Sequence, residues 1–225
     1  MTKKNYFGLS FGRLLFALLF SSIITVCGFL FKQAYTETAV SVFSVVMLMY
    51  LVEGKRTGCA CGVVYCVAFT AVCYTKGFYG LMVFNMLVAL PMYIISLFTW
   101  KKHSRGETVA VRRLPFKKLI LFSAAVSAGF VCAYLILGAA GSSNAVFDGL
   151  TLSLGAFGTL LLSLRYIEQW YFNLAANITA LIMWIIAAAA DISNLNFVIC
   201  TSVFVVSNVM ALVSWIKIER IQKNG

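Results

Sequence analysis

The sequence has little charge, and very little of that charge is acidic. Only 11% of the 225 residues are charged and seven are Asp or Glu, whereas 62% are hydrophobic and the mean hydropathy is +0.94. Soluble domains carry about 25% charged residues, so this chain lacks the polar surface that a globule of its size needs in water. Its hydrophobicity also excludes intrinsic disorder. We therefore expect a polytopic membrane protein rather than a soluble enzyme.

Histidine, proline and several catalytic motifs are also scarce or missing. The two Pro and 16 Gly form no linker-like segment. The only histidine, His103, is far from Cys59 and Cys61, and this cysteine pair lacks the spacing and the second ligand pair of a typical zinc site. The sequence contains no GxxxxGK[ST] loop, no HExxH and no serine nucleophile motif. We expect neither a metal, nor another cofactor, nor an enzymatic activity.

What the chain does contain is a series of long apolar runs. A helix needs about 20 apolar residues to cross the bilayer core, and continuous runs favour helices over alternating β-strands. We read the first run as a retained helix rather than a cleaved signal peptide. The eight runs are 14–31, 39–52, 59–75, 77–100, 119–140, 146–164, 170–190 and 195–216.

The distribution of positive charge predicts how these runs are oriented. With the N-terminus in the cytoplasm, 16 of the 18 Lys and Arg fall in inside segments, and only Lys32 and Lys76 fall outside. This asymmetry predicts an even number of crossings in the cell inner membrane, with both termini cytoplasmic. It also accounts for the net charge of +11, so we expect a lipid bilayer and no nucleic acid as partner.

The two halves of the chain carry a weak internal repeat around the basic segment 101–118. Tyr93 precedes Trp100 by seven residues and Asn208 precedes Trp215 by seven, and a Lys follows each Trp closely. Four crossings in each half would make the repeats parallel, a plan known in transporters with a midplane substrate site. Chance similarity between two apolar helices is the alternative explanation.

The runs have no Asp, Glu, Lys or Arg at their centres, but they do contain amides and aromatic rings. Carriers coupled to ions generally need buried ionisable groups, so this absence favours movement down the substrate's own gradient. Trp170, Asn173, Asn177 and Trp184 fall at offsets 0, 3, 7 and 14 and share one helix face. The other candidate binding residues are Asn85, Tyr93 and Trp100 in the run 77–100, Tyr65 in the third run and Asn208 in the eighth.

Each of these polar residues has an ordinary structural alternative. A single Asn in a membrane helix often bonds a neighbouring helix, for about 0.6–2 kcal/mol. Two Asn between two Trp on one face favour a ligand site instead, because indoles stack on planar or cationic rings and amides bind hydroxyls or carboxamides. Pro91 predicts a kink in the run 77–100, which serves either as a hinge or as a static packing feature.

Two stretches resemble the PnuC family of vitamin-precursor transporters. The first runs from Asn85 through Pro91-Met92 to Trp100 and its following basic residues; the second runs from Arg165 to Trp170 and on through Asn177 to Met183-Trp184. The basic segment that ends at Leu114 also fits. Three positions depart from the family's pattern: Tyr65 and Tyr93 stand where Gln is frequent, and Asn173 stands where a second aromatic residue is common.

The resemblance implies a specific fold. The family is built from two three-helix repeats joined by a linker helix, and is related to the SWEET sugar transporters. The whole chain, 1–225, would then be one transmembrane domain of about eight helices. Its parts would be an extra N-terminal helix at 14–31, a first repeat at 36–100, a linker helix at 119–140 and a second repeat at 146–216.

The resemblance also implies a function. We expect facilitated diffusion of a small-molecule substrate, nicotinamide riboside, with trapping by a separate cytoplasmic kinase and assembly as a homotrimer. Trp170 and Trp184 would face the pyridine ring of the substrate, and Asn177 and Asn85 would face the substrate's hydroxyls or carboxamide. A carrier of thiamine, riboflavin or a deoxynucleoside with the same fold is an alternative, and a non-transporting membrane subunit is another.

Overall fold

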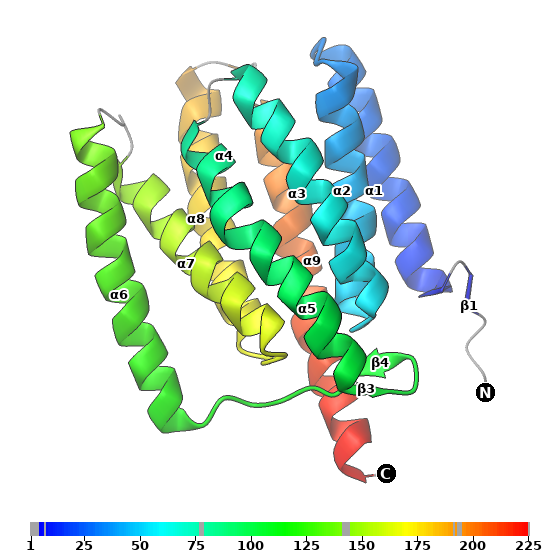
Figure 1. Cartoon of the computed structure of the whole chain (residues 1–225). Coiled ribbons are helices and arrows are strands. Elements are labelled where there is room, and N and C mark those ends of the chain that lie inside the picture. The colour runs from blue at the N-terminus through cyan, green and yellow to red at the C-terminus, as the bar shows by residue number, and fades with distance from the viewer. Residues whose placement is uncertain are drawn as a thin grey trace. The chain divides into compact units, whose positions relative to one another are not determined.

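The chain folds almost entirely into helices. The computed structural model describes residues 5–6, 8–76, 79–140, 145–190, 192 and 195–224. Within these ranges eight helical segments are long and apolar enough to cross a membrane, which confirms the predicted all-α polytopic class (Figure 1). Lys3 and Lys4, and the side chains of Lys76 and Arg105, entered the charge count but lie outside the described residues.

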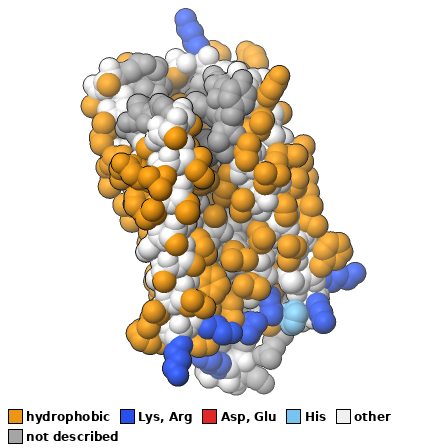
Figure 2. Space-filling view, turned by 60° about the vertical axis from the view of Figure 1, so that its left-hand side comes forward, with side chains coloured by type: hydrophobic (Ala, Val, Ile, Leu, Met, Phe, Trp, Pro, Cys, Tyr) orange, Lys and Arg blue, Asp and Glu red, His pale blue; other side chains and the backbone are white. Residues whose placement is uncertain are grey.

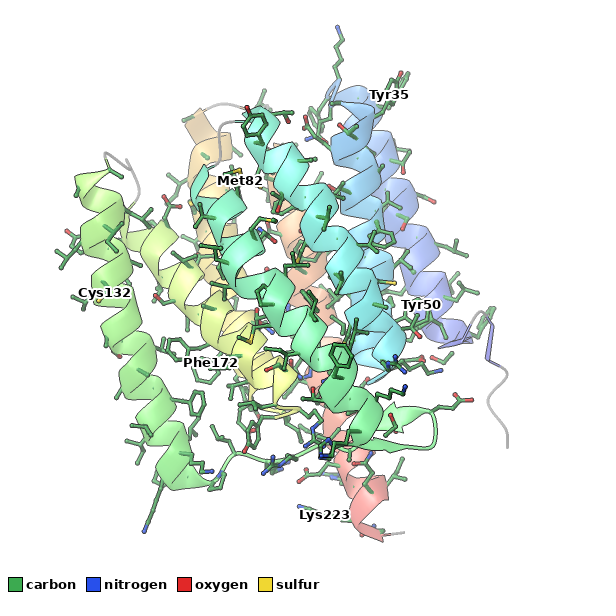
Figure 3. The ribbon with its side chains drawn as sticks, viewed as in Figure 1. Tyr35, Tyr50, Met82, Cys132, Phe172 and Lys223 are labelled. Carbon is green, nitrogen blue, oxygen red and sulfur yellow. The ribbon has the colours of Figure 1, made fainter. Side chains whose placement is uncertain are left out.

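The first of two compact units comprises Met1–Val109. Within it α1 packs on α2, α2 on α3, and α3 on α5. In Figure 3, Tyr35 and Tyr50 mark the two ends of α2. The elements are the antiparallel strands β1 (Asn5–Tyr6) and β2 (Leu9–Ser10), α1 (Phe11–Leu30), α2 (Tyr35–Val52), α3 (Arg56–Lys76), α4 (Tyr79–Phe84), the π-helical turn η1 (Asn85–Ala89), α5 (Leu90–Lys102), and the antiparallel strands β3 (Ser104–Arg105) and β4 (Thr108–Val109).

The second unit comprises Ala110–Gly225. Its helices α6, α7, α8 and α9 pack in chain order, each on the next. Leu114, Leu161 and Tyr166 form a buried cluster, and Phe172 of α8, labelled in Figure 3, packs against it. The helices are α6 (Phe116–Ala139), α7 (Ala145–Ser163), α8 (Gln169–Ala190) and α9 (Leu195–Asn224).

The surface is that of a protein immersed in lipid. Large hydrophobic side chains are exposed along the helices, such as Leu121 at 68% and Ile136 at 68% on α6. Figure 2 shows these side chains over the long flanks of the helices, with Lys and Arg side chains gathered mainly at the lower ends. Exposed apolar flanks need a hydrocarbon solvent, and the basic residues mark the ends that meet water.

The fourth span is irregular immediately before Pro91. The backbone N–H of Leu90 donates to the carbonyl of Asn85, five residues earlier, which closes the π-helical turn η1. Pro91 has no N–H to donate, so the wider turn and the missing bond are adjacent. Asn85 in this turn, and Ser96 and Trp100 after it, are buried, at 5%, 0% and 0% exposure. Such π-turns occur frequently at functional sites.

Helices α2 and α7 end in the same way, one in each unit. Gly54, at φ 67°, and Arg165, at φ 66°, adopt the left-handed conformation just after the two helices. The next residues, Lys55 and Tyr166, donate their N–H groups five residues back, to Tyr50 and Leu161 respectively, over 2.9 and 3.0 Å. This is the Schellman cap, which usually places glycine at the left-handed position. Arg165 is therefore a strained residue that the surrounding contacts hold in place.

Helices α3 and α5 approach closely at one glycine. A Cβ atom added to Gly62 would overlap the Tyr93 ring, whose Cγ would lie 2.7 Å away. The ring of Tyr93 therefore lies against the bare backbone of α3.

We expect Gly62→Ala to destabilise the protein by about 1–3 kcal/mol, because the Tyr93 ring would have to move within a packed interface. Gly138→Ala on α6 is the matched control, since nothing lies within 4 Å of its added Cβ. The control should be neutral or gain up to about 1 kcal/mol from helix propensity. Thermal unfolding in detergent measures both, and equal midpoints for the two variants would contradict the close packing.

Candidate functional site

Two fully buried indoles form the centre of the candidate site in the second unit. Trp170 on α8 is 2% exposed and Trp215 on α9 is 0% exposed. Their ring centroids are 5.7 Å apart at an interplanar angle of 76°, the edge-to-face geometry that aromatic pairs prefer. An indole face attracts cationic rings, which makes this pair the candidate element for binding a flat, cationic substrate.

An amide lies two helical turns from each indole, at matching positions. Asn177 follows Trp170 by seven residues on α8, and Asn208 precedes Trp215 by seven on α9. The two helices run antiparallel (Figure 1), with Trp170 against Trp215 and Trp184 against Phe197. In this register Asn177 and Asn208 share one level, about 10 Å along the helices from the indole pair. We call the depth of Trp170 and Trp215 the aromatic level, and the depth of Asn177 and Asn208 the amide level.

Most buried polar atoms without a hydrogen-bond partner belong to this region. Among the described residues, eight buried side-chain nitrogen and oxygen atoms have no partner. Six of the eight lie on the segment 165–170 or at 207–208: Arg165 Nε, both amide atoms of Gln169, Trp170 Nε1, Ser207 Oγ and Asn208 Oδ1. An unsatisfied buried polar group costs about 1–3 kcal/mol, so these atoms are suited to a ligand that supplies the missing bonds.

Backbone bonds to the segment 110–114 hold the start of α8. Arg112 N donates to Arg165 O, and Ile167 N donates to Arg112 O, each over 3.0 Å. The carboxylate of Glu168 accepts a 3.0 Å bond from Leu114 N. The residue that follows this anchor is Gln169, the first of α8. Gln169, with two unpaired side-chain atoms, and Trp170, with one, are therefore carried on a fixed backbone.

The segment 110–114 also binds the end of α9. Val111 N donates to Gln222 Oε1 over 3.0 Å, and Arg113 Nε donates to Glu219 Oε2 over 2.7 Å. The hydrogen bond to Glu219 raises the pKa of the Arg113 guanidinium. Lys223 adds a second cation at 2.7 Å from the same carboxylate. Glu219 is thus fully engaged and does not contribute a free negative charge to the site.

Arg165 is the buried cation closest along the chain to the site. It is 7% exposed, and one guanidinium nitrogen donates to Ala110 O over 3.2 Å. Burial lowers the pKa of its guanidinium, and the like charge of Arg112 adds to the effect. The guanidinium carbon of Arg112 itself lies 5.0 Å from the Tyr166 ring centroid.

The candidates in the first unit lie on α3, η1 and α5. Asn85 is buried at 5% exposure in η1, and Tyr93 lies against Gly62. Trp100 is completely buried at the end of α5, where its carbonyl accepts the Ser104 hydroxyl over 2.7 Å. The Tyr65 ring stacks on Phe69, with centroids 5.3 Å apart. Trp100 and Trp215 are thus both completely buried, one in each unit.

Two members of the predicted α8 stripe are engaged away from the indole pair. Trp184 stacks on Phe197 with centroids 4.3 Å apart, and it lies 14 residues, about 21 Å, from Trp170. One solute ring cannot contact both indoles at that separation. The Asn173 amide lies against α7, where its Cγ would be 2.9 Å from a Cβ added to Gly158. Asn177 Nδ2 donates to Asn173 O over 2.8 Å.

Sequence reasoning missed Gln169, Ser207 and Trp215 as candidates for the site. Trp215 was visible only as part of the internal repeat, and its burial is a tertiary property. Gln is usually exposed, and Gln169 stands at a helix end next to charged residues. For Ser207 the sequence did offer a signal. It directly precedes Asn208, and two adjacent polar residues within an apolar run are unusual.

Comparisons with known proteins agree on one family. The family model described as "Nicotinamide mononucleotide transporter" matches residues 34–217. A nicotinamide riboside transporter PnuC of Neisseria mucosa is 24% identical over 195 residues, 84% of this chain and 74% of the relative. One of Haemophilus influenzae is 28% identical over 162 residues, 67% of this chain and 72% of the relative. The crystal structure of the vitamin B3 transporter PnuC shares the fold, with a TM-score of 0.81 at 22% identity over 96% of this chain and 94% of that one.

The anchor at the start of α8 predicts a stability effect. We expect Glu168→Ala to cost about 1–3 kcal/mol, because the Leu114 N–H loses its acceptor, and Glu168→Gln to cost less, because the amide keeps an acceptor oxygen. Glu107→Ala is the control, since the Glu107 side chain is 73% exposed beside Lys55 and exposed pairs contribute about 0–1 kcal/mol. The midpoint of thermal unfolding in detergent reports all three. A Glu168→Ala midpoint no lower than that of the control would show that the anchor does not support the fold.

Proposed function

The chain belongs to the nicotinamide mononucleotide transporter family, and on this premise we propose that it carries nicotinamide riboside across the membrane by facilitated diffusion. The observation that supports this substrate most directly is the level of buried indoles beside a level of amides in the second unit. A pyridinium nucleoside has the matching parts, which are a flat cationic ring and a hydroxylated sugar.

The ring of the substrate would bind at Trp170 and Trp215. A cation over the face of a Trp gains about 0.5–2 kcal/mol, with the larger value where water is excluded. The sugar hydroxyls would then reach Asn177 and Asn208, whose amides both donate and accept. Asn208 Nδ2 already donates to Phe204 O over 2.7 Å, so Asn208 Oδ1 is the atom left to accept from a hydroxyl.

The absence of an acidic or basic residue at the centre of any span supports uncoupled transport. Glu168 and Glu219, two buried carboxylates of the second unit, are held by hydrogen bonds at the ends of α8 and α9. A proton-coupled or sodium-coupled carrier generally uses such groups inside the membrane. Net uptake would then depend on removal of the product, which we assign to phosphorylation by a separate cytoplasmic kinase.

The charge asymmetry supports a location in the cell inner membrane with both termini in the cytoplasm. The segment 110–114, with Arg112 and Arg113, would then lie on the cytoplasmic side with the end of α9. A homotrimer is the assembly that the family resemblance implies. A carrier of thiamine, riboflavin or a deoxynucleoside would use the same aromatic and amide levels, and a ligand screen separates these substrates.

Substituting two adjacent residues of α8, one buried and one exposed, tests the substrate site. We expect Trp170→Ala to reduce both binding and uptake of nicotinamide riboside at least tenfold, because the ring loses its stacking surface. Tyr171→Ala is the matched control, since Tyr171 is the next residue on α8 and is 51% exposed. Calorimetry on the purified protein and uptake into vesicles give the two readouts. Equal losses in both variants, or no loss in either, would place the site elsewhere.

Reconstituted vesicles test the mode of transport. We expect counterflow of labelled nicotinamide riboside into vesicles loaded with unlabelled substrate, unchanged when ionophores collapse the proton and sodium gradients, because no Asp, Glu, Lys or Arg lies at the centre of a span. Empty vesicles and the Trp170→Ala variant provide the background. Uptake that stops when either gradient collapses would overturn the uncoupled mechanism.

A further inference from the structure

Gln169 is an unusual residue for its position. Its side chain is completely buried, at 0% exposure, and neither its amide nitrogen nor its amide oxygen has a hydrogen-bond partner. Gln is mostly exposed in folded proteins, and a buried amide is normally paired. A Met or Leu in this place would avoid the unpaired atoms altogether. A second molecule that bonded both amide atoms would remove the cost of burying them unpaired.

The backbone around Gln169 is held by several hydrogen bonds. Arg165 before it is in the left-handed conformation, and Glu168 is anchored through Leu114 N. Gln169 N donates to Tyr166 O over 3.3 Å, and Trp170 N donates to Ile167 O over 3.0 Å. The amide is therefore carried on the same fixed turn as the Trp170 indole, whose own Nε1 is unpaired.

On the basis of the proposed function, we propose that Gln169 is a specificity-determining residue that binds the carboxamide of the pyridine ring stacked at Trp170. A primary amide presents one donor group and one acceptor oxygen, and a carboxamide presents the complementary acceptor and donor. The two groups satisfy each other in a planar pair. The bonds replace none within the protein, because neither Gln169 amide atom has a partner in the protein.

The same amide disfavours a carboxylate on the ring. A carboxylate only accepts, so its second oxygen would face Gln169 Oε1 with no hydrogen between them. Sites built to hydrogen-bond one group reject analogues that leave buried atoms unpaired. Arg165 is the group that would have the opposite effect, since its unpaired Nε would favour a carboxylate. The ratio of the affinities for the carboxamide and the carboxylate analogues therefore shows whether Gln169 or Arg165 binds the ring substituent.

The experiment compares nicotinamide riboside with nicotinic acid riboside by calorimetry on the purified full chain. We expect the wild type to bind the carboxamide at least tenfold more tightly. Gln169→Met keeps the size of the side chain and removes both polar atoms. We expect it to weaken carboxamide binding about tenfold, to bring the ratio close to one, and to raise the unfolding midpoint of the ligand-free protein, because two buried unpaired atoms disappear.

Gln222→Met is the matched control in the same unit, since Gln222 accepts a bond from Val111 N. It should lower the unfolding midpoint and leave the affinity ratio unchanged. A Gln169→Met variant that keeps the wild-type ratio, or a wild type that prefers the carboxylate, overturns the role of Gln169 while the transport function stands. A wild type that binds neither riboside overturns the proposed function itself.

Discussion

The interior of a bilayer offers no water, so every polar atom that enters it must find a partner in the protein. The backbone meets this requirement by forming helices, and the hydroxyls do so by bonding carbonyls of their own helix, as Ser96 does to Met92 O over 2.7 Å. Ser207 Oγ and Asn208 Oδ1 on α9, Thr70 Oγ1 and Thr151 Oγ1 are the exceptions within the described spans, and four further unpaired buried atoms lie on the segment 165–170, at the connection between α7 and α8 and the start of α8. Six of these eight atoms belong to the region that we propose binds the substrate.

The rigidity of that region comes from its surroundings. A non-glycine residue in the left-handed conformation is unfavourable by itself. At Arg165 it persists because the Schellman cap of α7, two bonds to Arg112 and the Glu168–Leu114 bond all fix the same turn. Gln169 and Trp170 follow this turn and are buried at the start of α8. A ligand that bound at this fixed turn would cost little conformational entropy in the protein.

Much of the fold was predictable because membrane spans depend on composition. The run 170–190 became α8 at Gln169–Ala190, and the run 119–140 became most of α6 at Phe116–Ala139. The site was less predictable. A stripe on one helix identifies the residues that share a face, but not their partners. Trp170 and Trp184 share a face of α8, yet Trp170 contacts Trp215 and Trp184 contacts Phe197. The two indoles therefore lie at different depths along the helix and have different neighbours.

The sequence by itself determined the membrane class, the number of spans and the uncharged character of their centres, because hydrophobic length and the positions of charges follow directly from residue order. Tertiary structure alone decided that Trp170 contacts Trp215, that Asn177 and Asn208 share a level, and that Gln169 is buried without a partner. These properties depend on the antiparallel register of α8 and α9 and on the bonds of the segment 110–114. Both join residues far apart in the chain, and residue order does not specify such pairings.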